Sequence, residues 1–435
     1  MTRVDPAPSA AAPPGREPAS GSDGVASTAA PSPGSGDAPL GPGGGVAASA
    51  PGPKPGPVDP SPAPAPAPAM PSAATKPHRA RRVSITLVGL AAALLIAALV
   101  SAATGQLPIP VAQILASLAT HLNEALAGLG TPDWLRLPVA TTPPTQLVDA
   151  TLWAIRLPRV VLAMAVGAAL SIGGLVMQGT FRNPLAEPGV VGVSSGAALA
   201  ASAAIVFGID GLGIFTAPAL AFAGGLVTSL LVYVTARSGG RTEVVTLVLT
   251  GIAINAVAGA GIALMTFLAD TQQREQIVFW QLGSLNGSRW QDVLVVLPIA
   301  AIGIVGAALL ARRLDLLALG ERQARHLGVD VERTRIVAIV VVAVLTAAAV
   351  ALCGIISFVG LVVPHLMRML LGPAHRALVP SCALGGAVLL LVADTVARTA
   401  VPYADLPIGM LTAIVGGPFF FWLLRRARRR SGGWA

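Results

Sequence analysis

The chain has 435 residues, of which 54% are hydrophobic and only 11% charged, whereas charged residues make up about a quarter of an average soluble domain. This composition excludes an ordinary soluble enzyme and predicts a protein that lies mainly in lipid. The formal net charge is +9, but the basic residues cluster beside apolar runs and do not form one nucleic-acid-binding face. Cys353 and Cys382 both fall within apolar runs, so we expect neither a disulfide framework nor a cysteine metal site.

The N-terminal region contains mostly Pro, Ala, Gly and Ser, including the run PSPAPAPAPAMP at 60–71. Such a segment cannot bury enough apolar surface to offset the entropy lost on ordering, and alternating prolines favour extended polyproline II. We therefore expect residues 1–82 to form a disordered cytoplasmic tail. The residues after Met1 do not resemble a signal peptide.

An all-α membrane domain with about ten transmembrane helices is predicted over residues 83–430. Each crossing needs about 20 predominantly apolar residues. Basic residues precede the first run, and Arg425–Arg430 follow the last, so the positive-inside rule places both termini in the cytoplasm. A kinked single helix across 353–356 would give nine spans and move the C-terminal arginines outside, which this rule opposes. The ten predicted spans are 84–104, 159–179, 190–208, 215–236, 243–267, 291–311, 336–353, 354–371, 378–398 and 407–424.

A long outward connection joins the first two spans. Residues 111–129, VAQILASLATHLNEALAGL, have the pattern of an amphipathic helix, and a Pro- and Thr-rich insert follows at 131–146.

A basic, amphipathic segment, RRLDLLALGERQARHLGVDVERTR at 312–335, separates two long apolar runs. It is too charged to span a bilayer and too apolar on one face to be a plain linker. Gly320 and Gly328 divide it into two predicted short helices, and Glu321 stands where a helix N-terminus favours negative charge. We interpret residues 314–335 as a cytoplasmic docking surface. Its predicted apolar stripe comprises Leu314, Leu317, Leu319, Ala324, Leu327 and Val329.

The sequence offers no catalytic or nucleotide-binding motif: P-loop, H-E-x-x-H, G-x-S-x-G and paired cysteine patterns are all missing. Any energy for transport must then come from a partner or an ion gradient. Polar residues within spans are costly in lipid and therefore mark candidate functional positions, here Gln178, Asn255 and Asp394. We favour interhelical hydrogen bonds for the first two and a local ion pair with Arg398, four residues on, for Asp394. An ion-coupling role for Asp394 is the alternative.

Three arginines, Arg156, Arg159 and Arg398, fall at the outer ends of predicted spans. Two interpretations explain them equally well. The arginines extend to the membrane interface by snorkelling, or they form a charged surface that receives an acidic partner.

Five stretches resemble one family: IRLPRVVLAMAVGAALSIGGLVMQGTFRNPLAEPGVVGVSSGAALAA (155–201), LVLTGIAIN (247–255), LALGERQARHLGV (317–329), GIISFVGLVVPHLMRMLLGPAHRALVP (354–380) and LPIGMLTAIVGGPFFFWLL (406–424). Together they resemble the FecCD-like permease subunits of bacterial ABC importers for iron–siderophore complexes, haem and vitamin B12. The resemblance covers about residues 84–425.

This resemblance implies a ten-helix subunit of the cytoplasmic membrane that pairs with itself or with a related permease and moves a metal chelate by alternating access. Two ABC ATPase subunits would bind below, where ATP and Mg²⁺ are held, and an extracytoplasmic binding protein would deliver the chelate; no cofactor is expected on this chain. The arginines at 156, 159 and 398 would meet glutamates of the binding protein. The translocation path would include Asn255, Pro407 and Gly409. Contact with the ATPase would involve Leu317, Leu319, Gly320, Glu321, Arg322, Ala324, Leu327 and Gly328.

The chain departs from the family pattern in its long tail, in the insert at 131–146 and at Glu187, where the family more often has Asp. An ion-coupled secondary transporter without an ATPase and a non-transporting membrane scaffold are the alternative functions.

Overall fold

The computed structural model describes residues 76–430 except 133, 135, 138–144 and 239–240. Residues 1–75 of the predicted tail, and part of the predicted insert, lie outside the described residues. The first helix, α1, spans Lys76–Ala103, so residues 76–82 are helical, contrary to the tail predicted over 1–82. The basic residues of this stretch are thus part of the helix that carries the first apolar run.

Every predicted span contains one helix, and the all-α membrane fold is confirmed. The first half of the described chain comprises α1, α2 (Val111–Gly128), α3 (Gln146–Thr151), a π-helical turn (Leu152–Arg156), α4 (Leu157–Phe181), a 3₁₀ turn (Pro188–Val191), α5 (Val193–Val206), a second 3₁₀ turn (Gly213–Phe215) and α6 (Thr216–Thr235).

A two-stranded antiparallel hairpin follows α6, with Arg237 opposite Thr242. The remaining elements are β1 (Arg237–Ser238), β2 (Arg241–Thr242), α7 (Val244–Leu268), α8 (Thr271–Leu282), α9 (Trp290–Leu317), α10 (Glu321–His326), α11 (Val331–Cys353), α12 (Val359–Leu371), α13 (His375–Thr399) and α14 (Ile408–Arg430).

Seven of the helices in the described part are long and apolar enough to cross a membrane, and α5, α12 and the apolar part of α14 are shorter. The junction at 353–356 is a break and not a kink, because α11 ends at Cys353 and Gly354 and Phe358 both have positive φ. At 1.5 Å per residue, the 13 residues of α12 extend about 20 Å, less than the thickness of a hydrocarbon core.

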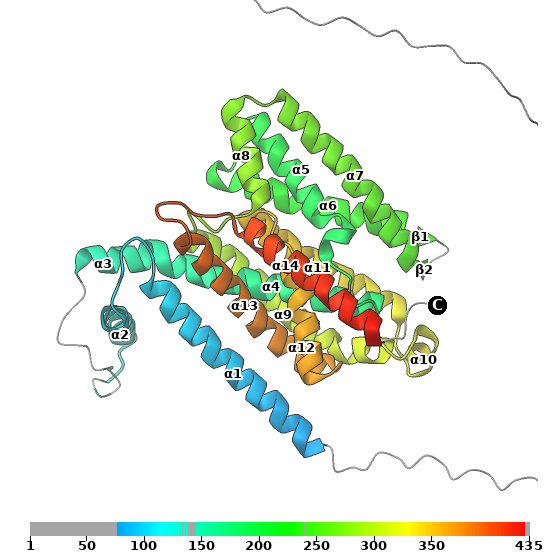
Figure 1. Cartoon of the computed structure of the whole chain (residues 1–435), viewed down its shortest axis with the longest axis horizontal. Helices are drawn as coiled ribbons and strands as arrows, with labels where there is room; N and C mark the ends of the chain where they lie inside the picture. The colour runs from blue at the N-terminus through cyan, green and yellow to red at the C-terminus, as the bar shows by residue number, and fades with distance from the viewer. Residues whose placement is uncertain (1–75, 133, 135, 138–144, 239–240, 431–435) are drawn as a thin grey trace, which may run out of the picture. The chain divides into compact units, whose positions relative to one another are not determined.

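Helix α4 lies at the centre of the helical unit and packs against α9, α11, α12 and α13 (Figure 1). Every residue from Ala165 to Phe181 is buried. Glycine and alanine allow this close approach, because they leave room for a neighbouring backbone. A Cβ on Gly167, for example, would lie 2.2 Å from the carbonyl oxygen of Gly386 on α13. By contrast, α1 and α9 have many exposed apolar side chains, as lipid-facing helices do.

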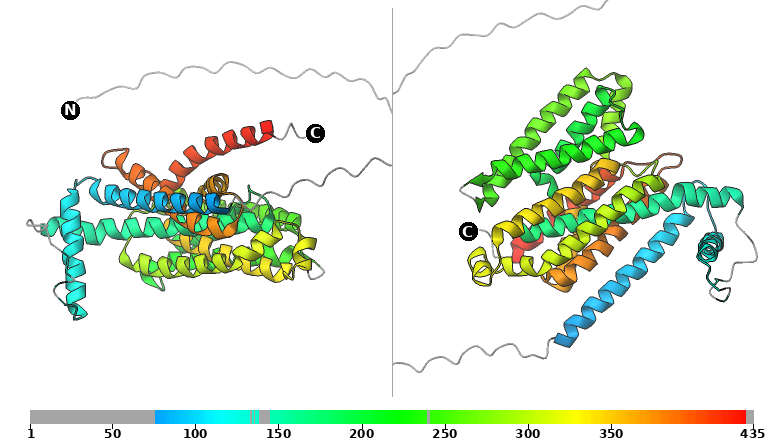
Figure 2. Two further views of the ribbon diagram at one scale, coloured as in Figure 1. Left: turned by 90° about the horizontal axis from the view of Figure 1, so that it is seen from below. Right: turned by 180° about the vertical axis from the view of Figure 1, so that it is seen from behind.

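The other helices lie around this centre. Helices α5 to α8 gather on one side of it, and α2, the predicted amphipathic helix, runs across the direction of α1 (Figures 1 and 2). Helix α8, within the connection after α7, was not predicted from the sequence. Its start is fixed by a capping box, in which Asp270 and Gln273 exchange side-chain-to-backbone hydrogen bonds.

Candidate functional site

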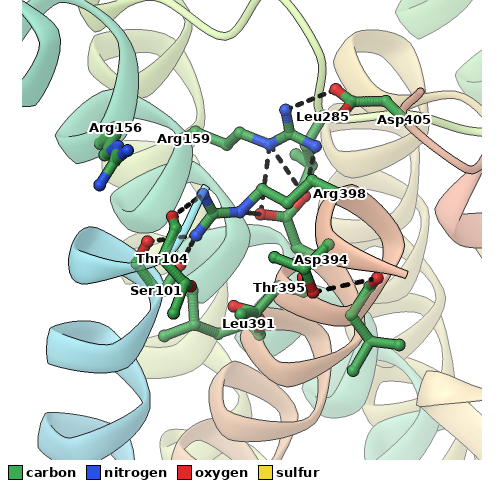
Figure 3. Close-up of polar contacts among 12 residues, drawn as sticks. Ser101, Thr104, Arg156, Arg159, Leu285, Leu391, Asp394, Thr395, Arg398 and Asp405 are labelled. Atoms are coloured by element: carbon green, nitrogen blue, oxygen red, sulfur yellow. Dashed lines mark hydrogen bonds and ion pairs between the residues drawn. The ribbon is translucent and has the colours of Figure 1, made fainter. Parts of the chain in front are cut away.

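The first candidate site is a buried cluster of charges, here called the arginine cluster, formed by Arg156, Arg159 and Arg398 with Asp394 and Asp405. Arg159, in the first turn of α4, donates from Nε to both carboxylate oxygens of Asp394 on α13, at 2.9 and 3.2 Å (Figure 3). Its Nη1 donates to Oδ2 of Asp405 at 2.8 Å. Asp394 is completely buried, so these bonds balance a carboxylate that would otherwise be costly.

Arg156 and Arg398 both donate to the C-terminal end of α1 and the turn after it. A helix C-terminus carries carbonyl groups without intrahelical partners and a partial negative charge, so a guanidinium is well matched to it. The backbone acceptors are Ala102 and Leu107 for Arg156 and Ser101 and Thr104 for Arg398.

These contacts refine two predictions. Asp394 is paired mainly with Arg159, whereas the predicted partner Arg398 lies farther away, with its Nε 3.7 Å from Oδ2. The arginines do not snorkel to an interface, since their side chains are largely buried and most of their donors are engaged inside the protein. Nε of Arg398 is the exception, because it is buried without a hydrogen-bond partner among the described residues. They line a cavity of about 320 Å³ beside α1. Reception of an acidic partner at this cavity remains a prediction.

The predicted path residues lie in separate surroundings. Asn255 on α7 accepts from Ser195 Oγ at 2.6 Å and donates to the Gly189 carbonyl at 3.3 Å, an interhelical role as predicted. At the start of α14, Pro407 and Gly409 lie beside the end of α8, and a Cβ on Gly409 would lie 2.4 Å from the Leu282 carbonyl oxygen. Among the described residues, no hydrogen bond joins Asn255 to this turn, so their common role in a path remains a prediction.

Gln178 likewise makes interhelical contacts. Its amide nitrogen, Nε2, donates to the backbone carbonyls of Gly360 and Leu361, and its Oε1 accepts from Arg368 at 2.9 Å. These bonds join α4 to α12, as the sequence predicts for this buried amide.

The second candidate site is the coupling segment (residues 314–335), which begins at the C-terminal end of α9 (Figure 1). Gly320 and Gly328 have φ of 117° and 82°, which confirms the two predicted bends. The segment contains one short helix and not two, because α9 continues to Leu317 and only α10 stands between the glycines.

The predicted apolar stripe of the coupling segment is split between two environments. Leu317 and Ala324 are fully buried and pack with Val329 in a small cluster. Leu319 and Leu327, in contrast, are 61% and 58% exposed. The stripe fails because the bend at Gly320 breaks the helical periodicity that relates Leu317 to later residues. Leu319, Leu327 and Arg322 are exposed at this end, as are Gln323, Arg325 and His326.

A set of polar contacts made by the C-terminal end of the coupling segment was not predicted from the sequence. Arg335, at the start of α11, binds Glu321 at 2.8 Å and the carbonyl of Thr242 at 2.6 Å. Glu332 accepts from both the backbone N–H and the hydroxyl of Thr242. The only sequence signal was that these charges directly precede an apolar span. They line, with Arg322, a cavity of about 840 Å³.

Glu187 has a structural role at a helix start. Its carboxylate accepts from the backbone N–H of Phe358 at 3.1 Å, just before α12. Burial raises the pKa of this carboxyl above its ordinary value, although the Phe358 hydrogen bond acts in the opposite direction. The departure from the family's Asp therefore lies at a contact between segments 171 residues apart in the chain.

Chemically, both sites are sets of internal ion pairs and hydrogen bonds, and an arrangement of this kind suits helices that move between packed states. Within the described ranges, no group of three or more His, Cys, Asp or Glu side chains is placed to hold a metal ion.

Comparison with known proteins gives a consistent result. Residues 93–426 match the FecCD transport family. The hemin transport system permease protein HmuU of Yersinia pestis is 46% identical over 286 residues, covering 64% of this chain and 84% of that protein. The cobalamin import system permease protein BtuC of Halobacterium salinarum is 41% identical over 337 residues, 76% of this chain and 89% of the relative.

Two further relatives agree. The Fe(3+) dicitrate transport system permease protein FecD of Escherichia coli is 43% identical and covers 63% of this chain and 84% of its own length. An inward-facing structure of a metal-chelate-type ABC transporter has a TM-score of 0.66 and 32% identity, covering 78% of this chain and 98% of that one.

These relatives are transport permeases and not enzymes, which confirms the interpretation of the sequence as an importer subunit. A permease of this class works with an ATPase, a substrate-binding protein and a second permease subunit. The chain therefore belongs to the FecCD transport family and is a multi-pass permease subunit of an ABC importer in the cytoplasmic membrane.

Proposed function

We propose that this permease moves a metal chelate, with a ferric siderophore as the first candidate and haem or cobalamin as the others, across the membrane by alternating access. The family match over residues 93–426 carries this proposal, and the named relatives transport hemin, cobalamin and ferric dicitrate. Partner ATPases hold ATP and Mg²⁺ and supply the energy. The permease itself couples two equilibria through its helix arrangement and breaks no bond.

The two candidate sites fit opposite faces of such a machine. The basic residues at the start of α1 and after Trp422 favour a cytoplasmic location for both termini. The coupling segment then lies on the cytoplasmic side, where Leu319, Arg322 and Leu327 form the ATPase contact. The arginine cluster lies on the outer side, where acidic groups of the binding protein dock at its cavity. Asn255 and the turn at Pro407–Gly409 line the path.

ATP-dependent uptake tests this function directly. Proteoliposomes that contain the chain, its ATPase and its binding protein are loaded with ATP or left empty, and radioiron–siderophore uptake is measured. We expect uptake only with ATP, and we expect it to survive an ionophore. Haem or cobalamin uptake without siderophore uptake keeps the class and changes the cargo. Ionophore-sensitive uptake without ATP would instead establish an ion-coupled carrier.

The exposed side chains of the coupling segment should control ATPase binding. Replacing Leu319 and Arg322 with alanine is expected to weaken ATPase binding about tenfold or more, because interface anchors of this size typically contribute over 1 kcal/mol each. Binding of the purified ATPase to the permease in nanodiscs measures the effect. Leu309→Ala on α9 is the matched control, since Leu309 is exposed but lies outside the coupling segment. Equal binding by the double variant and the control would exclude these contacts.

A further inference from the structure

Polar residues at the C-terminal end of the coupling segment join α10 and α11 to the hairpin before α7, which lies 93 residues earlier in the chain than Arg335. Arg335 on α11 is only 4% exposed, and its two terminal nitrogens point to different segments. Nη2 binds Oε1 of Glu321 at the start of α10, and Nη1 donates to the backbone carbonyl of Thr242 in the hairpin before α7. One guanidinium therefore links α10 to the hairpin.

Glu332, one turn earlier on α11, completes this junction. Its carboxylate accepts from the Thr242 backbone N–H at 3.2 Å and from the Thr242 hydroxyl, and it lies 3.5 Å from the Tyr233 hydroxyl at the end of α6. It also lies 3.8 Å from Arg335 Nη1. Thr242 is thus held through its N–H, its carbonyl and its hydroxyl, and it is itself 4% exposed.

We propose that Arg335 is the positioning residue that transmits movement of α10 to the start of α7. This proposal rests on the proposed function, in which the ATPase moves the coupling segment. Helix α10 has six residues and is too short to be stable alone, so its orientation depends on its contacts with the rest of the chain. Thr242 is two residues before Val244, where α7 begins, and α7 carries the predicted path residue Asn255.

The chemistry of the junction requires arginine. A planar guanidinium presents donors in two fixed directions, toward Glu321 and Thr242 at once, whereas a lysine ammonium is a single point charge. Arg335 also separates the carboxylates of Glu321 and Glu332, so its removal leaves two acidic groups facing one site without their shared cation. We therefore expect α10 and the hairpin to move independently when Arg335 is lost.

The test is the amount of chelate imported per ATP hydrolysed by the complete importer in proteoliposomes. For Arg335→Gln we expect this ratio to fall about fivefold or more, the lower end of typical coupling effects, while ATP hydrolysis continues. Arg335→Lys, which keeps the charge, should give an intermediate ratio and remains informative if the glutamine variant does not fold. Arg376→Gln is the matched control, because Arg376 is an exposed arginine at the start of α13, outside the coupling segment.

A residue that only stabilises the fold would lower hydrolysis and import together. An unchanged ratio in Arg335→Lys and in any folded Arg335→Gln protein, whatever the total activity, therefore overturns the proposal. Failure of the unaltered complex to import the siderophore, haem or cobalamin with ATP would overturn the proposed function itself, and with it the role assigned to Arg335. The two failures are distinguished by the unaltered complex alone.

Discussion

Replacing Asp394 with alanine is expected to leave little folded protein. The carboxylate of Asp394 is fully buried and accepts two hydrogen bonds from Arg159 Nε, while Arg398 lies on its other side. Removing one partner of a buried ion pair costs about 3–5 kcal/mol, because the remaining charge is left without compensation. Here Arg159 would keep only Asp405 as a partner, and Arg398 would lose its carboxylate neighbour.

Thermal unfolding of the purified protein in nanodiscs measures this effect. Asp394→Asn should fall between the wild type and Asp394→Ala, because an amide oxygen still accepts a hydrogen bond but carries no charge. Asp405→Ala is the control: this carboxylate is partly exposed and also binds Arg159, so its loss should cost only about 1 kcal/mol or less.

The same variants separate two roles of Asp394. In an ATP-driven importer, folded Asp394→Asn protein should retain ATP-dependent uptake per molecule, since its residual defect is in stability. Normal stability combined with a complete loss of uptake would contradict the structural role and would return ion coupling to consideration. Unfolding of Asp394→Ala at the wild-type temperature would show that the buried pair contributes little.

Local patterns in the sequence were sufficient to predict most of the fold. Long apolar runs require about 20 residues per crossing, and each of the ten runs contains a helix. The lengths of individual helices were less predictable where the backbone conformation of one or two residues ends or delays a helix. Residues 354–358 were included in a span, yet positive φ at Gly354 and Phe358 delays the start of α12 to Val359. Helix α8 was missed because hydropathy does not reveal a polar helix that begins with a capping box.

The candidate sites were predictable in position but not in contacts. The bends at Gly320 and Gly328 follow from glycine's tolerance of positive φ, so the sequence could place them. The pairing of Arg159 with Asp394 joins residues 235 apart, whereas sequence spacing favoured Arg398 at four residues. Helical periodicity applies only within one continuous helix, and tertiary packing determines which of several arginines reaches a buried carboxylate.

Helix α4 offers the second large expected effect, at its crossing with α12. Replacing Gly174 with alanine would place a Cβ 1.8 Å from the carbonyl oxygen of Gly360. Ordinary carbon–oxygen contacts are about 3.3–3.6 Å, so the two backbones would have to separate by about 1.5 Å. The obstacle is backbone and cannot rotate away, and separation would also lengthen the bond from Gln178 to the Gly360 carbonyl. We expect a loss of about 3 kcal/mol or more, at the upper end for overpacked cores.

Gly89→Ala on α1 provides the matched control, because a Cβ at Gly89 would meet nothing within 4 Å. Alanine in an open helical position is expected to be neutral or to stabilise by about 0.5–1 kcal/mol. Unfolding temperatures of the two variants, measured side by side in nanodiscs, should therefore change in opposite directions or differ by the full cost at Gly174. If both variants unfolded like the wild type, α4 and α12 would have to be farther apart than the structure places them.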